Sequence, residues 1–104
     1  MTAIVLFFAG ALLCNSIPHL TRGLSGAPFP TPFAKPHGIG DSSPLVNVLW
    51  GSVNLLAGTV LLTKHPATVG LNPEFAALAI GFLVVGIFAS QHFGKVRRNK
   101  RTDR

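Results

Sequence analysis

Residues 44–63 read PLVNVLWGSVNLLAGTVLLT, an apolar run without a single Asp, Glu, Lys or Arg. Two more runs share this character: residues 2–20, which also lack those four residue types, and residues 74–93, in which only Glu74 at the start is charged. An α-helix rises about 1.5 Å per residue, so about 20 residues cross a hydrocarbon core of about 30 Å. The sequence therefore predicts an all-α membrane protein with three transmembrane helices in a small bundle.

The composition agrees with this class of protein. Of the 104 residues, 48% are hydrophobic and only 12% are charged, and the mean hydropathy is +0.48. A water-soluble domain carries about 25% charged residues. The single cysteine, Cys14, has no partner in this chain for an intrachain disulfide or a four-cysteine metal site. Because no basic residue precedes the first apolar run, we expect that run to remain as a helix rather than to be cleaved as a signal peptide.

Proline and glycine residues mark the expected helix ends. Ser43-Pro44 and Asn72-Pro73 each place a capping side chain before a proline, which is tolerated in the first helical turn. Pro66 should stop the second helix, Gly94 should cap the third, and Pro18 should end or kink the first. The prediction is one transmembrane domain, residues 1–94, with helices at about 2–20, 44–63 and 74–93, a Pro/Gly/Phe-rich loop at 21–43, and a basic tail at 95–104.

Basic residues are concentrated at the C-terminal end of the chain. Six of the nine Lys and Arg residues lie in the last ten positions: Lys95, Arg97, Arg98, Lys100, Arg101 and Arg104. Because cytoplasmic flanks of membrane helices are enriched in Lys and Arg, the C-terminus is expected inside and, with three spans, the N-terminus outside. A basic tail in this position is attracted to anionic lipid headgroups by about 1 kcal/mol per charge. No aromatic residue interrupts the tail, so we expect no nucleic-acid binding.

The connection between the first two helices is the most distinctive segment. Residues 15–36 read NSIPHLTRGLSGAPFPTPFAKP, and the prolines in the second half of this segment exclude a regular helix there. We expect an interfacial loop in which Pro18 and His19 lie at the helix end, while Phe29 and Phe33 rest in the membrane interface or against the helices. The alternative is a solvated linker in which both phenylalanines are incidental.

One side of the second helix carries small and amide residues. Asn47, Gly51, Asn54 and Gly58 are spaced by four, three and four residues, which aligns them on one helix face. Glycine permits close approach of a neighbouring helix, and asparagine amides form hydrogen bonds between membrane helices. The stripe therefore predicts a helix-packing face, and the alternative is that the two asparagines line a polar path. Small residues four apart on the other two helices are expected to match it: Gly10 with Cys14, and Gly86 with Ser90.

Histidines are the candidate metal-binding side chains near the membrane. In the expected topology His19 and His92 lie at the same membrane face, where they are able to approach each other as metal or haem ligands. No His-x-x-x-His spacing or nearby carboxylate strengthens such a site. His37, Asp41 and Ser42 are the residue types of a hydrolytic triad, but they lie in a Gly-rich loop that does not fix their geometry. We therefore expect no cofactor, no metal and no enzymatic activity.

Four short motifs lie in the first half of the chain: Pro-His at residues 18–19, Gly-x-x-Gly at 23–26, Phe-Pro-Thr-Pro-Phe at 29–33 and Asn-Val-Leu-Trp-Gly at 47–51. With these motifs, about the first 55 residues of the chain resemble a family of uncharacterised small bacterial integral membrane proteins. The resemblance implies a three-span protein of the bacterial inner membrane. It implies no activity.

These patterns favour a function that does not depend on a reactive site. We expect a small integral membrane protein that acts as an accessory or scaffolding subunit, or as a homo-oligomer, in contact with anionic lipids and a membrane-protein partner. The alternative is a small oligomeric channel or transport protein with a path lined by Asn47 and Asn54.

Overall fold

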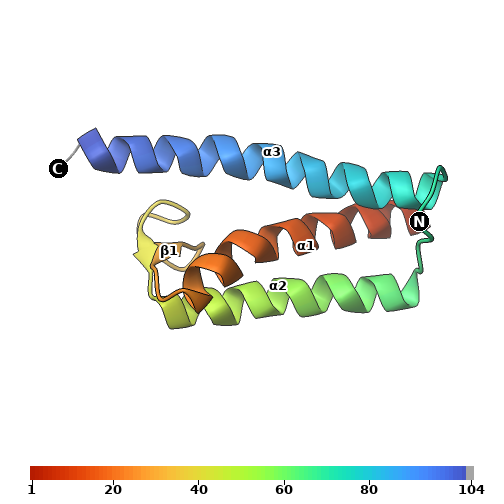
Figure 1. Cartoon of the computed structure of the whole chain (residues 1–104), viewed down its shortest axis with the longest axis horizontal. Helices are drawn as coiled ribbons and strands as arrows, with labels where there is room; N and C mark the ends of the chain where they lie inside the picture. Colours follow the sequence, from red (N-terminus) through yellow and green to blue (C-terminus); the bar gives the residue numbers. More distant parts are fainter. Residues whose placement is uncertain (103–104) are drawn as a thin grey trace.

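The computed structural model describes residues 1–102 and contains three long helices (Figure 1). Helix α1 spans Thr2–Leu24, α2 spans Pro44–Lys64 and α3 spans Pro73–Thr102. Each of the three is long and apolar enough to cross a membrane. Arg104, which belongs to the predicted basic tail, lies outside the described residues.

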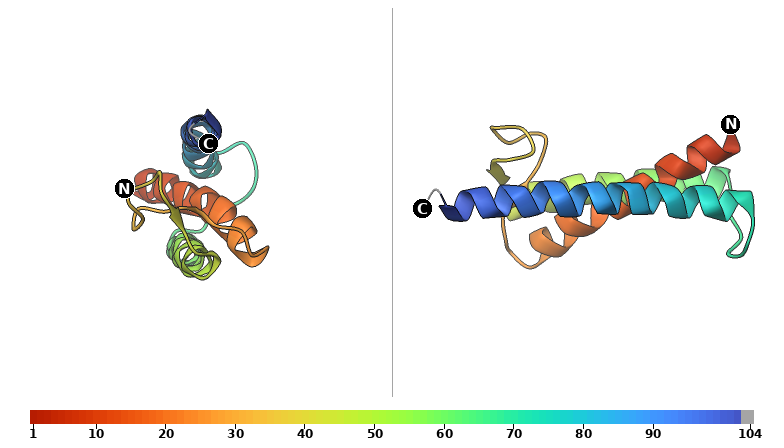
Figure 2. Two further views of the ribbon diagram at one scale, coloured as in Figure 1. Left: turned by 90° about the vertical axis from the view of Figure 1, so that its left-hand side faces the viewer. Right: turned by 90° about the horizontal axis from the view of Figure 1, so that it is seen from above.

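The helices lie side by side in a row with α1 in the middle (Figures 1 and 2). Helix α1 packs along both α2 and α3, whereas α2 and α3 make little or no direct contact with each other. Residues 25–43 cover the end of the row where α1 finishes and α2 begins, and we call this the capped end. The N-terminus and residues 65–72, which connect α2 to α3, lie at the opposite end.

The connection over the capped end contains a short β-ladder that the sequence did not predict. Strands β1, Phe29–Pro30, and β2, Asp41–Ser42, pair antiparallel, and Phe29 lies opposite Ser42. The side chains of Thr31 and Ser42 share a hydrogen bond, and the backbone nitrogen of Gly38 donates to the carbonyl oxygen of Thr31 at 2.9 Å. The Pro-rich segment therefore folds back on itself as a hairpin.

Polar side chains cap the starts of α2 and α3. Ser43 Oγ accepts a hydrogen bond from the backbone nitrogen of Val46 at 3.2 Å, and Asn72 Oδ1 accepts one from the backbone nitrogen of Phe75 at 2.8 Å. A proline follows each capping residue, Pro44 in α2 and Pro73 in α3. The N–H that proline lacks would have no helical partner in the first turn in any case.

The prediction that α1 ends near residue 20 is wrong. Helix α1 continues through Pro18 to Leu24, so Pro18 does not end it, and Gly23 lies inside the helix. Proline removes only one backbone hydrogen bond, the one to the carbonyl oxygen four residues back, and the packing of α1 against α2 and α3 keeps the helix continuous past it. Gly23 is needed for packing, since a Cβ on it would lie 2.8 Å from the carbonyl oxygen of Pro44.

The prediction that α3 ends near residue 93 with Gly94 as its cap is also wrong. The helix passes through Gly94 to Thr102, so the described part of the basic tail is helical. Glycine inside a helix costs only about 1 kcal/mol, no proline follows it, and Lys and Arg are good helix formers. Basic side chains in the last turns also interact favourably with the helix dipole.

Candidate functional site

Asn47 joins α1, α2 and the loop at the capped end. Its Nδ2 lies 2.9, 3.2 and 3.1 Å from the backbone oxygens of Phe29, Ser42 and Ser43. Because this nitrogen donates to carbonyls, the amide Oδ1 is the acceptor that faces His19 Nδ1 at 2.8 Å, and the imidazole donates from Nδ1. Asn47 is fully buried and His19 is 2% exposed. One amide thus holds three segments together, since it bonds to α1, to the loop and to the start of its own helix.

The loop is also attached to α3. His92 Nε2 donates to the backbone oxygen of Gly38 at 2.8 Å, and Lys100 Nζ lies 2.9 Å from Asp41 Oδ1. The ring of Phe29 is wedged between His19 of α1 and Phe93 of α3, with centroid distances of 5.4 and 4.6 Å. These contacts favour an ordered cap over a solvated linker.

The two phenylalanines of the loop have different environments. Phe29 is 9% exposed, whereas Phe33 is 62% exposed and contacts the edge of Trp50 on α2 with a centroid distance of 5.0 Å. Phe33 therefore presents an apolar ring at the rim of the capped end.

The four sequence motifs of the first half meet at this end. The histidine of the Pro18-His19 pair bonds to Asn47, and Phe29 packs on the same imidazole. A Cβ on Gly51 would lie 3.0 Å from the backbone nitrogen of Leu20, so this glycine lets α2 approach α1 beside the histidine. The motifs thus come from α1, the loop and α2, and they belong to one structure.

All four stripe residues of α2 face α1. Asn47, Gly51, Asn54 and Gly58 are the buried residues of this helix. Asn54 Oδ1 accepts from Asn15 Nδ2 at 3.0 Å, and Asn54 Nδ2 donates to the carbonyl oxygen of its own helix at 2.8 Å, four residues back. The stripe is therefore occupied within the chain.

Helix α3 meets α1 at Gly10, which is one of the expected small residues, and at Gly81, which is not. Cβ atoms on Gly10 and Gly81 would overlap backbone atoms of the opposite helix, the carbonyl oxygens of Leu78 and Phe7 respectively. Gly86 leaves more room, since its Cβ would lie 3.4 Å from Cys14 Sγ. In the sequence, both Gly81 and Gly86 have a second small residue four or five positions away. This spacing therefore did not indicate which of the two glycines packs more tightly against α1.

A small cavity of about 250 Å³ lies beneath the loop, between the helices. His19 and His92, the candidate ligand pair, both line it, but each uses one ring nitrogen in a hydrogen bond within the protein. Trp50 also lines the cavity, and its indole N–H is buried without a hydrogen-bond partner among residues 1–102. Within that range, no three His, Cys, Asp or Glu side chains gather as a metal site.

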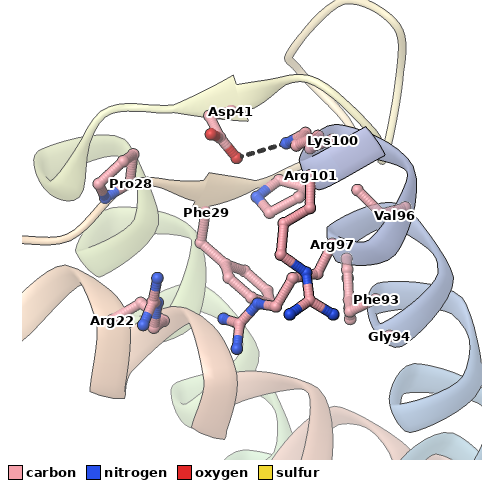
Figure 3. A pocket seen from close by; sticks show the side chains of 11 residues that line it. Arg22, Pro28, Phe29, Asp41, Phe93, Gly94, Val96, Arg97, Lys100 and Arg101 are labelled. Carbon is pink, nitrogen blue, oxygen red and sulfur yellow. Dashed lines mark hydrogen bonds and ion pairs between the residues drawn. The ribbon is translucent and has the colours of Figure 1, made fainter. Parts of the chain in front are cut away.

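A larger pocket of about 640 Å³ opens on the other side of Phe29 and Phe93 (Figure 3). We call it the basic pocket, and its charged lining residues are Arg22, Asp41, Arg97, Lys100 and Arg101. Three of them, Arg97, Lys100 and Arg101, belong to the predicted headgroup-binding set, whereas Lys95 and Arg98 of that set do not line the pocket. Arg22 was missed, because its position 75 residues before Arg97 gives no sign that the two share a surface.

The residue types of a hydrolytic triad do not come together. His37 Nδ1 donates to a backbone oxygen of the loop at 2.7 Å, Asp41 pairs with Lys100, and Ser42 bonds to Thr31. Each of these side chains thus helps to hold the loop in place. The groups that the capped end offers to a ligand are mainly cationic.

Comparison with known proteins gave no match, since no family model, no curated protein and no solved structure is significantly similar to this chain.

Proposed function

We propose that this chain is a multi-pass protein of the bacterial inner membrane that acts without enzymatic activity, as an accessory or scaffolding subunit of a membrane complex or as a homo-oligomer. Three helices of sufficient length and apolarity support the membrane assignment. In the proposed topology the capped end faces the cytoplasm. Arg22, Lys35 and the basic residues of α3 gather there, while Lys64 lies at the opposite end, in keeping with the positive-inside rule.

The observation that carries this proposal is the use of polar side chains at the capped end. A catalytic site keeps a nucleophile, acid or base available to a substrate. Here the amide of Asn47, the loop hydroxyls and the Asp41 carboxylate are all bonded to other parts of the protein. The chemistry of the site therefore supports a rigid binding surface rather than a reaction.

The surfaces available to a partner inside the membrane are apolar. Exposed residues on the outer side of α2 include Leu45, Leu49, Val53, Leu56 and Val60, and those on α3 include Ile80, Leu83, Val84, Ile87 and Phe88. Because the small-residue stripe of α2 is occupied by α1, we propose that a partner helix packs against these larger side chains. Such packing relies on van der Waals contact rather than on buried hydrogen bonds.

A channel with an asparagine-lined path has weaker support. Both amides are nearly inaccessible, at 0% exposure for Asn47 and 3% for Asn54, and both face α1. A conducting path along them would require α1 to separate from α2.

The proposal is tested by affinity purification of the tagged chain from native membranes in a mild detergent, followed by mass spectrometry and measurement of the complex mass. We expect a stoichiometric membrane-protein partner or a defined homo-oligomer. Gly51→Leu forces α1 and α2 apart and should abolish the assembly, whereas Lys95→Gln, at an exposed position of α3, should leave it intact. A monodisperse monomer with no companion would contradict the proposal, and a homo-oligomer that conducts ions in liposomes would favour the channel.

A further inference from the structure

Two helices that are distant in sequence supply the cations of the basic pocket. Arg22 comes from the last turn of α1, whereas Arg97 and Arg101 lie one turn apart on α3. Figure 3 shows their guanidinium groups projecting into the same hollow beside the ring of Phe29. General attraction of a basic tail to lipid headgroups does not require an arginine from α1. The placement of Arg22 beside the arginines of α3 therefore indicates a more specific role for the pocket.

The three arginines lack carboxylate partners among residues 1–102. The carboxylate on the pocket wall, Asp41, is paired with Lys100 at 2.9 Å. Glu74 lies at the start of α3, at the opposite end of the row. Three like charges around one hollow repel each other, and an anion placed between them is attracted to all three, which offsets this repulsion. Guanidinium groups also match the geometry of phosphate oxygens, to which they donate paired hydrogen bonds.

The floor of the pocket is apolar. Phe29 and Phe93 lie 4.6 Å apart between ring centroids, and Val96 is 7% exposed. The pocket lies at the point where the apolar part of α3 gives way to its basic end. A ligand that fits both features has a phosphate for the arginines and an apolar portion that continues into the membrane.

We infer that the basic pocket binds one phosphate ester per chain, namely the headgroup phosphate of an anionic phospholipid. This inference rests on the proposed function, because it needs the capped end to lie at a membrane surface. The volume of about 640 Å³ is within the usual range of small-molecule sites. The same phosphate chemistry is present in soluble phosphate esters, so the experiment has to separate the two sources.

The chain offers a matched pair of variants on α3. Arg97→Gln with Arg101→Gln removes two pocket charges, while Lys95→Gln with Arg98→Gln removes two charges from the same helix outside the pocket lining. We would titrate the full-length chain in non-ionic detergent with dioleoylphosphatidylglycerol and count bound lipid by native mass spectrometry. We expect one lipid per chain and at least about tenfold weaker binding by the pocket variant. The control variant should lose several-fold less, because Lys95 and Arg98 contribute only general attraction to the headgroup and do not line the pocket. Equal weakening by both variants would show diffuse attraction and overturn the inference.

Further probes keep the test decisive if the double variant folds poorly. Arg22→Gln changes only α1 and should also weaken the lipid, while Arg22→Lys keeps the charge and should weaken it less. Phosphatidylcholine should bind more weakly than phosphatidylglycerol, and equal binding would overturn the inference. Displacement of the lipid by millimolar glycerol 3-phosphate supports the phosphate site with a soluble ligand, whereas retention of the lipid supports the phospholipid. The pocket variant should still co-migrate with its membrane partner even if it no longer binds the lipid. Loss of lipid binding and loss of the partner therefore test the inference and the proposed function separately.

Discussion

The two neighbours of α1 are held in different ways. Toward α2, amide groups form hydrogen bonds between helices, Asn15 with Asn54 and His19 with Asn47. Toward α3, Gly10 and Gly81 bring backbone against backbone. In a membrane, burial of apolar surface gives little drive for helices to associate, because lipid tails are as apolar as leucine. This chain therefore uses hydrogen bonds on the α2 side of α1 and close van der Waals contact on the α3 side.

The loop compensates for this difference. Because α2 and α3 scarcely touch, the capped end supplies their connection: Asn47 binds the loop from α2, while His92 and Lys100 bind it from α3. The loop therefore acts as a clamp across the row of helices. Substitutions on each side of α1 should reveal which kind of contact contributes more to stability.

The largest loss of stability is expected from a substitution in the glycine contact between α1 and α3. Gly81→Ala places a Cβ on the carbonyl oxygen of Phe7, and backbone cannot move aside as a flexible side chain does. We expect a loss of about 3 kcal/mol, at the upper end for overpacked sites, and a lower thermal midpoint in detergent followed by circular dichroism. Gly86→Ala is the control, since its Cβ reaches only ordinary contact with Cys14 and should leave stability unchanged or slightly higher. Equal behaviour of the two variants would contradict close packing at Gly81.

Asn47→Leu should cause the next largest loss of stability, because it removes the amide that bonds α2 to α1 and to the loop. The side chain of His19 and the carbonyl oxygens of three residues lose their buried partner. We expect a destabilisation of about 2–3 kcal/mol and release of the loop. Limited chymotrypsin digestion measures the release, since Phe33 is exposed on the loop and is followed by Ala34, so the bond between them should be cut faster. An unchanged cleavage rate would show that Asn47 does not hold the cap.

Asn54→Leu separates helix pairing from loop anchoring. It removes the hydrogen bond with Asn15 but no contact to the loop, so we expect a loss of about 1 kcal/mol with no faster chymotrypsin cleavage after Phe33. A double-mutant cycle with Asn15→Leu isolates the energy of the pair. A coupling energy near zero would mean that the amides are side by side without stabilising each other.

Particular residues show what the sequence predicts about this molecule. The spacing of Asn47, Gly51, Asn54 and Gly58 identifies one helix face, because α-helical periodicity converts spacing directly into position. The same periodicity carries no information on contacts between segments, so the role of Gly81 and the approach of Arg22 to Arg97 could not be predicted. The short β-ladder was missed because it is stabilised by Asn47 and Thr31 from outside the strands rather than by strand propensity.

Loss of the ion pair between the loop and α3 should have the smallest effect on stability among these substitutions. It should, however, change the charge of the basic pocket. Asp41 and Lys100 are both partly exposed, at 43% and 34%, so their attraction is screened by solvent and contributes at most about 1 kcal/mol. Asp41→Asn should therefore leave the thermal midpoint nearly unchanged, while His92 continues to hold the loop through Gly38. The same substitution removes the carboxylate from the pocket wall and frees Lys100 for an anion, so phosphatidylglycerol should bind several-fold more tightly. A large fall in stability would show that the ion pair, rather than the hydrogen bonds, clamps the loop to α3, and weaker lipid binding would contradict an anion site at the capped end.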